Sequence, residues 1–171
     1  VLGLAYGIAR WLELTEDTAF WAVTSVATGN MLGGFSAVIL TRKTSTRFLL
    51  RMIPMLTIIA ILILVAPQLL SNSTPLLLVL LGLFLAGYSY GAIIAIYPAA
   101  VTDIFGLASS ARAYGQIFTA WGLAGLLGPW FSGWLFDRSG SYFIALSIAG
   151  ILTIISIVIA SKISMESDNP K

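Results

Sequence analysis

The side chains in this 171-residue chain that could contact a small molecule are uncharged and lie inside long apolar segments. Trp121 is the first candidate, because it falls near the middle of a segment, away from the ends where tryptophans of apolar helices usually lie. Gln116 and Thr119 are three residues apart and Arg112 precedes Gln116 by four, so these three share one helix face. That stripe predicts either a path for a polar substrate or hydrogen bonds between neighbouring helices.

Three further candidates come from two other segments. Tyr90 lies seven residues before Tyr97 on one helix face, which indicates either stacking against a substrate or, as the favoured alternative, packing in a core. Thr28 and Asn30 add a hydroxyl and an amide to a glycine-rich segment. A hydroxyl in an apolar helix often bonds its own backbone, so a binding role is the less favoured alternative for Thr28.

The composition excludes the covalent and metal chemistry that depends on cysteine or histidine. The chain has no cysteine and no histidine, which removes disulfides, Cys- or His-ligated metals and Ser-His-Asp triads. No Asp, Glu, Lys or Arg falls in the middle of a complete apolar segment, where a charge costs at least about 2.5 kcal/mol and marks binding or coupling. We therefore expect no enzyme, no metal and no cofactor, and we expect any proton-coupling group to lie outside this chain.

The composition assigns the chain to a lipid bilayer. It is 58% hydrophobic and 9% charged with a mean hydropathy of +0.97, whereas soluble domains are about 25% charged. A net charge of +2 gives no reason to expect nucleic acid. Helices that cross a bilayer need about 20 apolar residues. The stretches that meet this length are 18–40, 48–69, 76–101, 113–136 and 142–161, with a connection over 103–112. The shorter stretch 1–11 predicts the end of a truncated helix.

The basic residues predict the orientation of these helices. One side carries seven of the nine Lys and Arg residues, which lie after the stretch 18–40, after the stretch 76–101 and in the C-terminal tail. The other side carries only Arg10 and Arg138. Because cytoplasmic loops are enriched in Lys and Arg, we expect the C-terminus in the cytoplasm.

Glycine separates the segments into two groups. It is dense in 18–40, 76–101 and 113–136, and nearly absent from 48–69 and 142–161. Gly29 with Gly33, and Gly87 with Gly91, have the four-residue spacing of small residues that lets membrane helices approach closely. We expect the three glycine-rich segments to pack inside or line a cavity, and the other two to face lipid. Taken in chain order with 1–11 as the first, the six segments form two groups of three, and the last segment of each group, 48–69 or 142–161, is then peripheral.

A loop motif lies at the end of the stretch 113–136. The pattern is G-x-x-x-D-R-x-G, formed by Gly133, Asp137, Arg138 and Gly140. A degenerate counterpart lies at 37–44, at the end of the stretch 18–40. The two copies fall on opposite sides, which is typical of three-helix repeats with inverted topology in transporters. The motif predicts either a conformational latch made by Asp137 and Arg138 or, as the favoured alternative, a plain tight turn.

The G-x-x-x-D-R-x-G pattern resembles the loop signature of the major facilitator superfamily. The stretches 97–106 and 114–129, with Tyr97-Pro98, Asp103, Tyr114-Gly115 and Gly128-Pro129, resemble the oxalate–formate antiporter branch, whose neighbours are the monocarboxylate transporters. The resemblance covers nearly the whole chain and implies an all-α membrane fold. This chain would be the C-terminal six-helix bundle, first helix truncated, of a twelve-helix fold with two inverted three-helix repeats.

The resemblance implies secondary transport of small organic anions by alternating access, with the missing N-terminal six-helix half as partner. It implies a bacterial inner membrane. In that branch a Lys on helix eleven and an Arg on helix eight hold the carboxylates of the substrate; here Trp121 stands at the first position and Gly33 near the second. This departure argues against oxalate itself.

We expect a transmembrane bundle over 1–163 and a cytoplasmic tail over 164–171. Two other functions stay open beside transport. A membrane-embedded scaffold or assembly subunit would use the glycine-rich helices to pack a partner. An intramembrane enzyme is disfavoured, because no Asp pair, histidine cluster or visible base is present.

Overall fold

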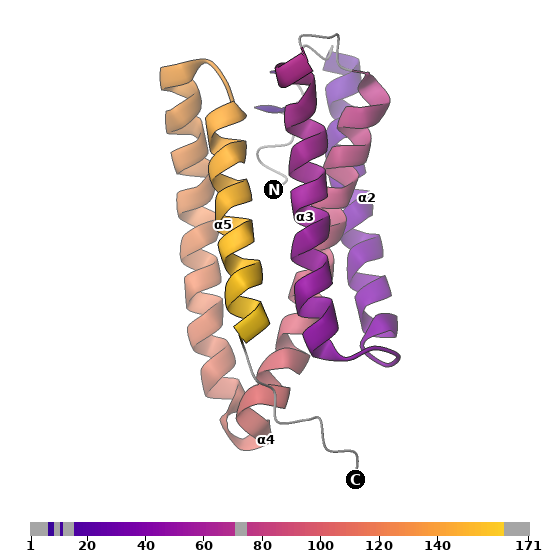
Figure 1. Ribbon diagram of the computed structural model, residues 1–171, viewed down its shortest axis with the longest axis vertical. Helices are drawn as coiled ribbons and strands as arrows, with labels where there is room; N and C mark the ends of the chain where they lie inside the picture. The colour runs from indigo at the N-terminus through magenta and orange to yellow at the C-terminus, as the bar shows by residue number, and fades with distance from the viewer. Residues whose placement is uncertain (1–6, 9–10, 12–15, 71–74, 163–171) are drawn as a thin grey trace.

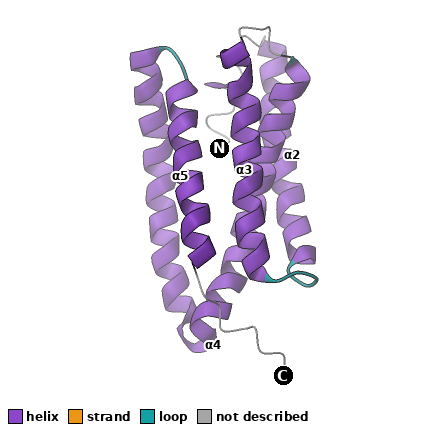
Figure 2. Cartoon of the chain, viewed as in Figure 1, coloured by secondary structure: helices purple, strands orange, loops and turns teal. Residues whose placement is uncertain are grey.

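The computed structural model describes residues 7–8, 11, 16–70 and 75–162, and every regular element in these residues is a helix. The helices are α2 (Glu16–Leu40), α3 (Thr46–Leu70), α4 (Leu76–Ser139) and α5 (Phe143–Lys162). All four are long and apolar enough to cross a membrane. Figure 2 shows in teal the short connections between α2 and α3 and between α4 and α5. The expectation of a multi-pass helical membrane fold is confirmed.

The fourth helix is two antiparallel arms joined at one residue. Gly106 has φ 71° and ψ 163°, a conformation that L side chains rarely adopt, and helical geometry continues on both sides of it. We call residues 76–105 the first arm and 107–139 the second arm. Figure 1 shows α4 turning back on itself at its lower end. The reversal falls inside the predicted connection over 103–112, but helical geometry continues up to and beyond the glycine, so no extended loop is present there.

Two pairs of glycines hold α2 against the first arm at backbone contact distance. A Cβ on Gly29 or Gly33 would overlap the carbonyl oxygens of Phe84 and Tyr88, and a Cβ on Gly87 would overlap that of Val26. Helices in lipid gain little from apolar burial against each other, so close contact and interhelical hydrogen bonds hold them together. The close approach expected from the glycine spacing is confirmed.

Two side-chain hydrogen bonds reinforce this helix pair. The hydroxyl of Ser25 donates to the carbonyl oxygen of Leu80 over 2.7 Å, and the hydroxyl oxygens of Ser36 and Tyr88 are 2.6 Å apart. Both join α2 to the first arm. They anchor the helix pair at two levels.

The two segments that we expected to face lipid, 48–69 and 142–161, correspond to α3 and α5 and differ in burial. Leu49 and Ile53 of α3 are buried with Ala37, Ala92 and Ile96, so one face of α3 belongs to the core. In contrast, α5 has no buried residue. It lies beside the second arm and also contacts α3 (Figure 1). The apolar composition of α3 did not reveal this packed face, because core and lipid favour the same side chains.

The second arm, which we expected to pack inside the bundle or to line a cavity, has an open glycine face. A Cβ on any of its glycines, Gly115, Gly122, Gly125, Gly128 or Gly133, would meet nothing within 4 Å. Residues 121–131 of this arm are all exposed. No other described helix covers this small-residue face.

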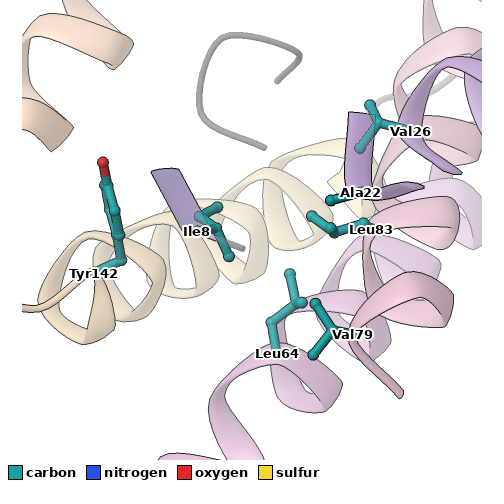
Figure 3. Close-up of a cluster of buried hydrophobic side chains, with 7 residues drawn as sticks. All are labelled: Ile8, Ala22, Val26, Leu64, Val79, Leu83 and Tyr142. Carbon is teal, nitrogen blue, oxygen red and sulfur yellow. The ribbon is translucent and has the colours of Figure 1, made fainter. Parts of the chain in front are cut away.

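One end of the bundle is closed by an apolar cluster that reaches back to the start of the chain. Figure 3 shows Ile8 between Tyr142 on one side and Ala22, Val26 and Leu83 on the other. Trp11 makes an edge contact with the Tyr142 ring, at 6.1 Å between centroids. The cluster therefore ties the first arm to the connection between the second arm and α5.

The opposite end is tied by polar contacts. The hydroxyl of Thr46 donates to a carboxylate oxygen of Asp103 over 2.9 Å, and the Arg51 guanidinium donates to the Ser161 carbonyl oxygen over 2.9 Å. The start of α3, the end of the first arm and the end of α5 therefore share one end, as the charge distribution predicted. The expected tail over 164–171 lies outside the described residues.

Candidate functional site: an aromatic cleft between the arms of α4

The reversal at Gly106 places the inner faces of the two arms opposite each other. A cleft of about 210 Å³ lies between them. Its first-arm wall is Ile94 and Tyr97, and its second-arm wall is Tyr114, Ile117, Phe118, Ala120 and Trp121. We call this the aromatic cleft. Its volume is below the range of about 300–1,000 Å³ that is typical of small-molecule pockets, so it can enclose only a small molecule or part of one.

Aromatic rings form a continuous series along one wall of the cleft and across to the other arm. On the second arm, the ring centroids of Tyr114 and Phe118 are 5.3 Å apart, and those of Phe118 and Trp121 are 4.8 Å apart. Trp121 then stacks on Tyr90 of the first arm at 6.4 Å and 24°. These offset arrangements are favourable for aromatic pairs. They give the cleft a preformed apolar wall.

The chemistry available in the cleft is stacking and hydrogen bonding. Tyr97 and Tyr114 bring phenol groups and Trp121 an indole N–H to its lining, while the other lining residues are apolar. None of the lining residues is charged. The cleft can therefore hold the apolar part of a ligand and donate hydrogen bonds to a carboxylate, but its own side chains do not neutralise the negative charge.

The structure brings together some of the predicted site residues and separates others. Trp121, which is 38% exposed, meets Tyr90 and lines the cleft with Tyr97. Gln116 and Thr119 are exposed and are not part of the lining. The Thr119 hydroxyl donates to its own helix at Gly115 over 3.0 Å. The second arm thus has two different faces, an aromatic one and a polar one.

The candidates on α2 lie at a separate groove. Thr28 is exposed and donates to the Thr24 carbonyl oxygen over 2.8 Å. Asn30 lines a groove of about 410 Å³ between α2 and the first arm, together with Gly34, Gly91 and Ile94. Ile94 also lines the aromatic cleft, so groove and cleft adjoin at this residue.

The position near the helix-eight arginine of the antiporter branch cannot hold an arginine here. A Cβ on Gly33 would overlap the Tyr88 carbonyl oxygen, whereas a Cβ on Gly34 would have room, with its nearest neighbour, the Gly91 carbonyl oxygen, 3.8 Å away. The close helix contact explains why position 33 carries no side chain. Neither Gly33 nor Trp121 supplies the positive charge used in that branch.

The G-x-x-x-D-R-x-G motif caps the second arm. Gly140 has φ 67°, and its N–H donates to the Phe136 carbonyl oxygen over 2.7 Å. The Arg138 guanidinium lies 4.2 Å from the centre of the Trp134 ring. Burial raises the pKa of Tyr142 above its ordinary value, and the negative charge of Asp137 adds a smaller increase. A conformational role for the motif stays a prediction.

Sequence reasoning did not name most of the cleft wall. Phe118, Ile94 and Ile117 were missed, and Tyr114 was noted only as part of a family resemblance. The spacing of Tyr114, Phe118 and Trp121, at steps of four and three, would have placed them on one helix face. That spacing does not distinguish a cleft wall from a buried core.

Comparison with known proteins supports the resemblance noted in the sequence. A sequence model of the Major Facilitator Superfamily matches residues 1–170. Monocarboxylate transporter 14 from Homo sapiens and its counterpart from Mus musculus are each 38% identical to this chain over 74 residues. The matched segment covers 43% of this chain but only 14% of each relative.

Proposed function

Because this chain belongs to the major facilitator superfamily, we propose that it is part of a secondary transporter that moves small organic anions by alternating access. Family membership places it among membrane transporters and not among enzymes. The substrates that we propose are mono- or dicarboxylates, and the two relatives are named as monocarboxylate transporters.

The stack of Trp121, a lining residue of the aromatic cleft, on Tyr90 of the other arm is the observation that carries the proposal. A cleft with aromatic walls, hydrogen-bond donors and no charged lining residue suits an anion with an apolar body better than a small dianion. We infer that the preferred substrate is a monocarboxylate, and that its negative charge is met by residues outside this chain.

The shape of α4 supports alternating access. The backbone joins the two arms at Gly106, so we propose that a small rotation at this residue changes the width of the cleft. The glycine face of the second arm, open in this structure, is a surface on which the N-terminal half of the protein could pack. We propose that this half completes the transport path.

For localisation we propose a bacterial inner membrane with the C-terminus in the cytoplasm. The second part rests on the asymmetry of Lys and Arg between the two ends. The first rests on family resemblance.

Uptake into proteoliposomes containing the complete protein tests the proposal. We expect counterflow of a labelled aromatic or branched monocarboxylate to exceed that of labelled oxalate. Empty liposomes provide the background. No counterflow with either class of carboxylate, from protein that is monodisperse and folded, would contradict it.

A scaffold function is the second candidate, and the open glycine face of the second arm is the observation that favours it. Such a face is suited to binding a helix of another protein. Native gel electrophoresis of the complete protein distinguishes the two functions. A stoichiometric foreign partner together with the absence of uptake would favour the scaffold.

A further inference from the structure

A second cavity lies behind the aromatic cleft, between α3, the first arm and α5. Its volume is about 340 Å³, and we call it the rear cavity. Six of the side chains that line it carry hydroxyl groups: Thr57, Ser89, Tyr90, Tyr97, Thr153 and Ser156. Pro54, Ile93 and Leu152 are among its apolar lining residues. None of its lining residues is Asp, Glu, Lys or Arg.

Three of these hydroxyls already donate a hydrogen bond to a carbonyl oxygen of their own helix. Thr153 donates to the Ala149 carbonyl oxygen over 2.7 Å and Ser156 to that of Leu152 over 2.9 Å. Thr57 makes a longer bond of 3.4 Å to the Ile53 carbonyl oxygen. A hydroxyl has one proton and two lone pairs, so the oxygens of these three side chains retain only acceptor capacity. The wall therefore favours a ligand that donates a hydrogen bond.

Ser89 is different, because its hydroxyl has no partner. The residue is 1% exposed, and its Oγ is the one buried side-chain oxygen in the described residues without a hydrogen bond. Buried hydroxyls are nearly always paired, because an unpaired one has lost its water without compensation. Ser89 can both donate and accept, so a group bound in the rear cavity would complete it.

We propose that the rear cavity binds an uncharged amphiphile that carries one hydroxyl group. The hydroxyl of the ligand would accept a hydrogen bond from Ser89 and donate one to an accepting oxygen of Thr57, Thr153 or Ser156. Its apolar body would contact Ile93 and Leu152. The absence of a charged lining residue disfavours an ion. The volume lies at the lower end of the range for small-molecule sites.

This site is separate from the aromatic cleft but shares a wall with it. Tyr97 lines both cavities, and Tyr90 of the rear cavity stacks on Trp121 of the cleft. A bound alcohol would therefore contact the two tyrosines from behind. The inference does not rest on transport, because it concerns a ligand bound on the opposite side of these tyrosines.

Photolabelling of the complete protein in nanodiscs with 3-azioctanol tests the proposal. We expect saturable labelling within residues 86–97 and 152–156, mapped by mass spectrometry. Octanol should compete with it, whereas octane, which lacks the hydroxyl, should not. Competition by 1-propanol added from water, compared with octanol added to the lipid, distinguishes an aqueous source of the ligand from a membrane source.

Variants provide a second test of the proposal. Ser89→Ala should weaken the labelling by about fivefold, as expected for one lost hydrogen bond. Ala86→Leu, which fills the cavity, should abolish it. The control is Ser110→Ala, which removes an exposed hydroxyl of the same helix that donates to the Leu107 carbonyl oxygen. That variant should label as the parent protein does.

Labelling that does not saturate, that octane competes as well as octanol, or that Ser89→Ala leaves unchanged would overturn the proposal. The cavity would then hold only water or lipid chains. If Ala86→Leu fails to fold, as judged by size-exclusion chromatography, the Ser89→Ala variant and the competition series still decide the question.

Discussion

The indole of Trp121 stacks on the phenol ring of Tyr90, with 6.4 Å between ring centroids and 24° between ring planes. Tyr90 belongs to the first arm of α4 and Trp121, which lines the aromatic cleft, belongs to the second, so this ring contact joins the two arms. The backbone joins the arms at Gly106. The stacked pair therefore helps to set how far the arms separate, together with the apolar cluster around Tyr142 and the contact of α3 with α5.

Replacing Trp121 tests the cleft as a substrate site. We expect Trp121→Ala to raise the KM for monocarboxylate uptake by about two- to tenfold, the range expected from loss of an aromatic stacking contact. The control is Trp130→Ala, because Trp130 lies on the same arm and is 67% exposed outside the cleft lining. Equal effects of the two changes would show that loss of any tryptophan of this arm impairs uptake.

Double variants test the separation of the two faces of the second arm. We predict that Gln116→Ala also alters uptake, through the polar stripe and not through the cleft. Because Gln116 does not line the cleft, its effect should multiply with that of Trp121→Ala. Tyr90→Ala and Trp121→Ala, whose rings touch, should be non-additive. Uptake kinetics of the four-member cycles measure both couplings, and unchanged uptake in Gln116→Ala removes that residue from the site.

Two neighbouring glycines test the helix contact. Gly33→Ala should lower the thermal stability of the protein in detergent, because the added Cβ would overlap the Tyr88 carbonyl oxygen and push α2 from the first arm. Overpacking of this kind costs about 1–3 kcal/mol. Gly34→Ala adds the same atom where the nearest neighbour, the Gly91 carbonyl oxygen, is 3.8 Å away, so it should have little effect. Similar melting temperatures for the two variants would refute the close contact.

Gly106 tests the hinge. Gly106→Ala forces an L residue into φ 71° and ψ 163°, which costs about 1–3 kcal/mol and should reduce both the yield and the melting temperature. Gly150→Ala is the matched control, since its added Cβ would make only an ordinary contact of 3.8 Å to Ile61. If Gly106→Ala behaves like Gly150→Ala, the reversal of α4 does not depend on this conformation.

Orientation can be tested by labelling, because this chain contains no cysteine. Single substitutions Lys43→Cys and Ser139→Cys place a thiol in exposed positions at opposite ends of the bundle. If the basic end is cytoplasmic, a membrane-impermeant maleimide should label only the second position in intact cells. Both should react after lysis. The reverse pattern would place the C-terminus outside.

Much of the architecture could be predicted from composition and spacing. Long apolar runs specify membrane helices, because a backbone in lipid must satisfy its hydrogen bonds internally. The four-residue spacing of Gly29 with Gly33 and of Gly87 with Gly91 predicted close helix contacts, because only residues without a side chain let two backbones meet. The distribution of Lys and Arg predicted which connections share one end.

The tertiary structure alone decided how these parts meet. It paired the glycines of α2 with those of the first arm, and it buried one face of α3, whose composition suits core and lipid alike. It turned the predicted connection over 103–112 into a reversal at Gly106, and so brought Tyr90 to Trp121, 31 residues later in the sequence. Local spacing places residues on a face of one helix, but the face that a second helix presents depends on where the chain turns.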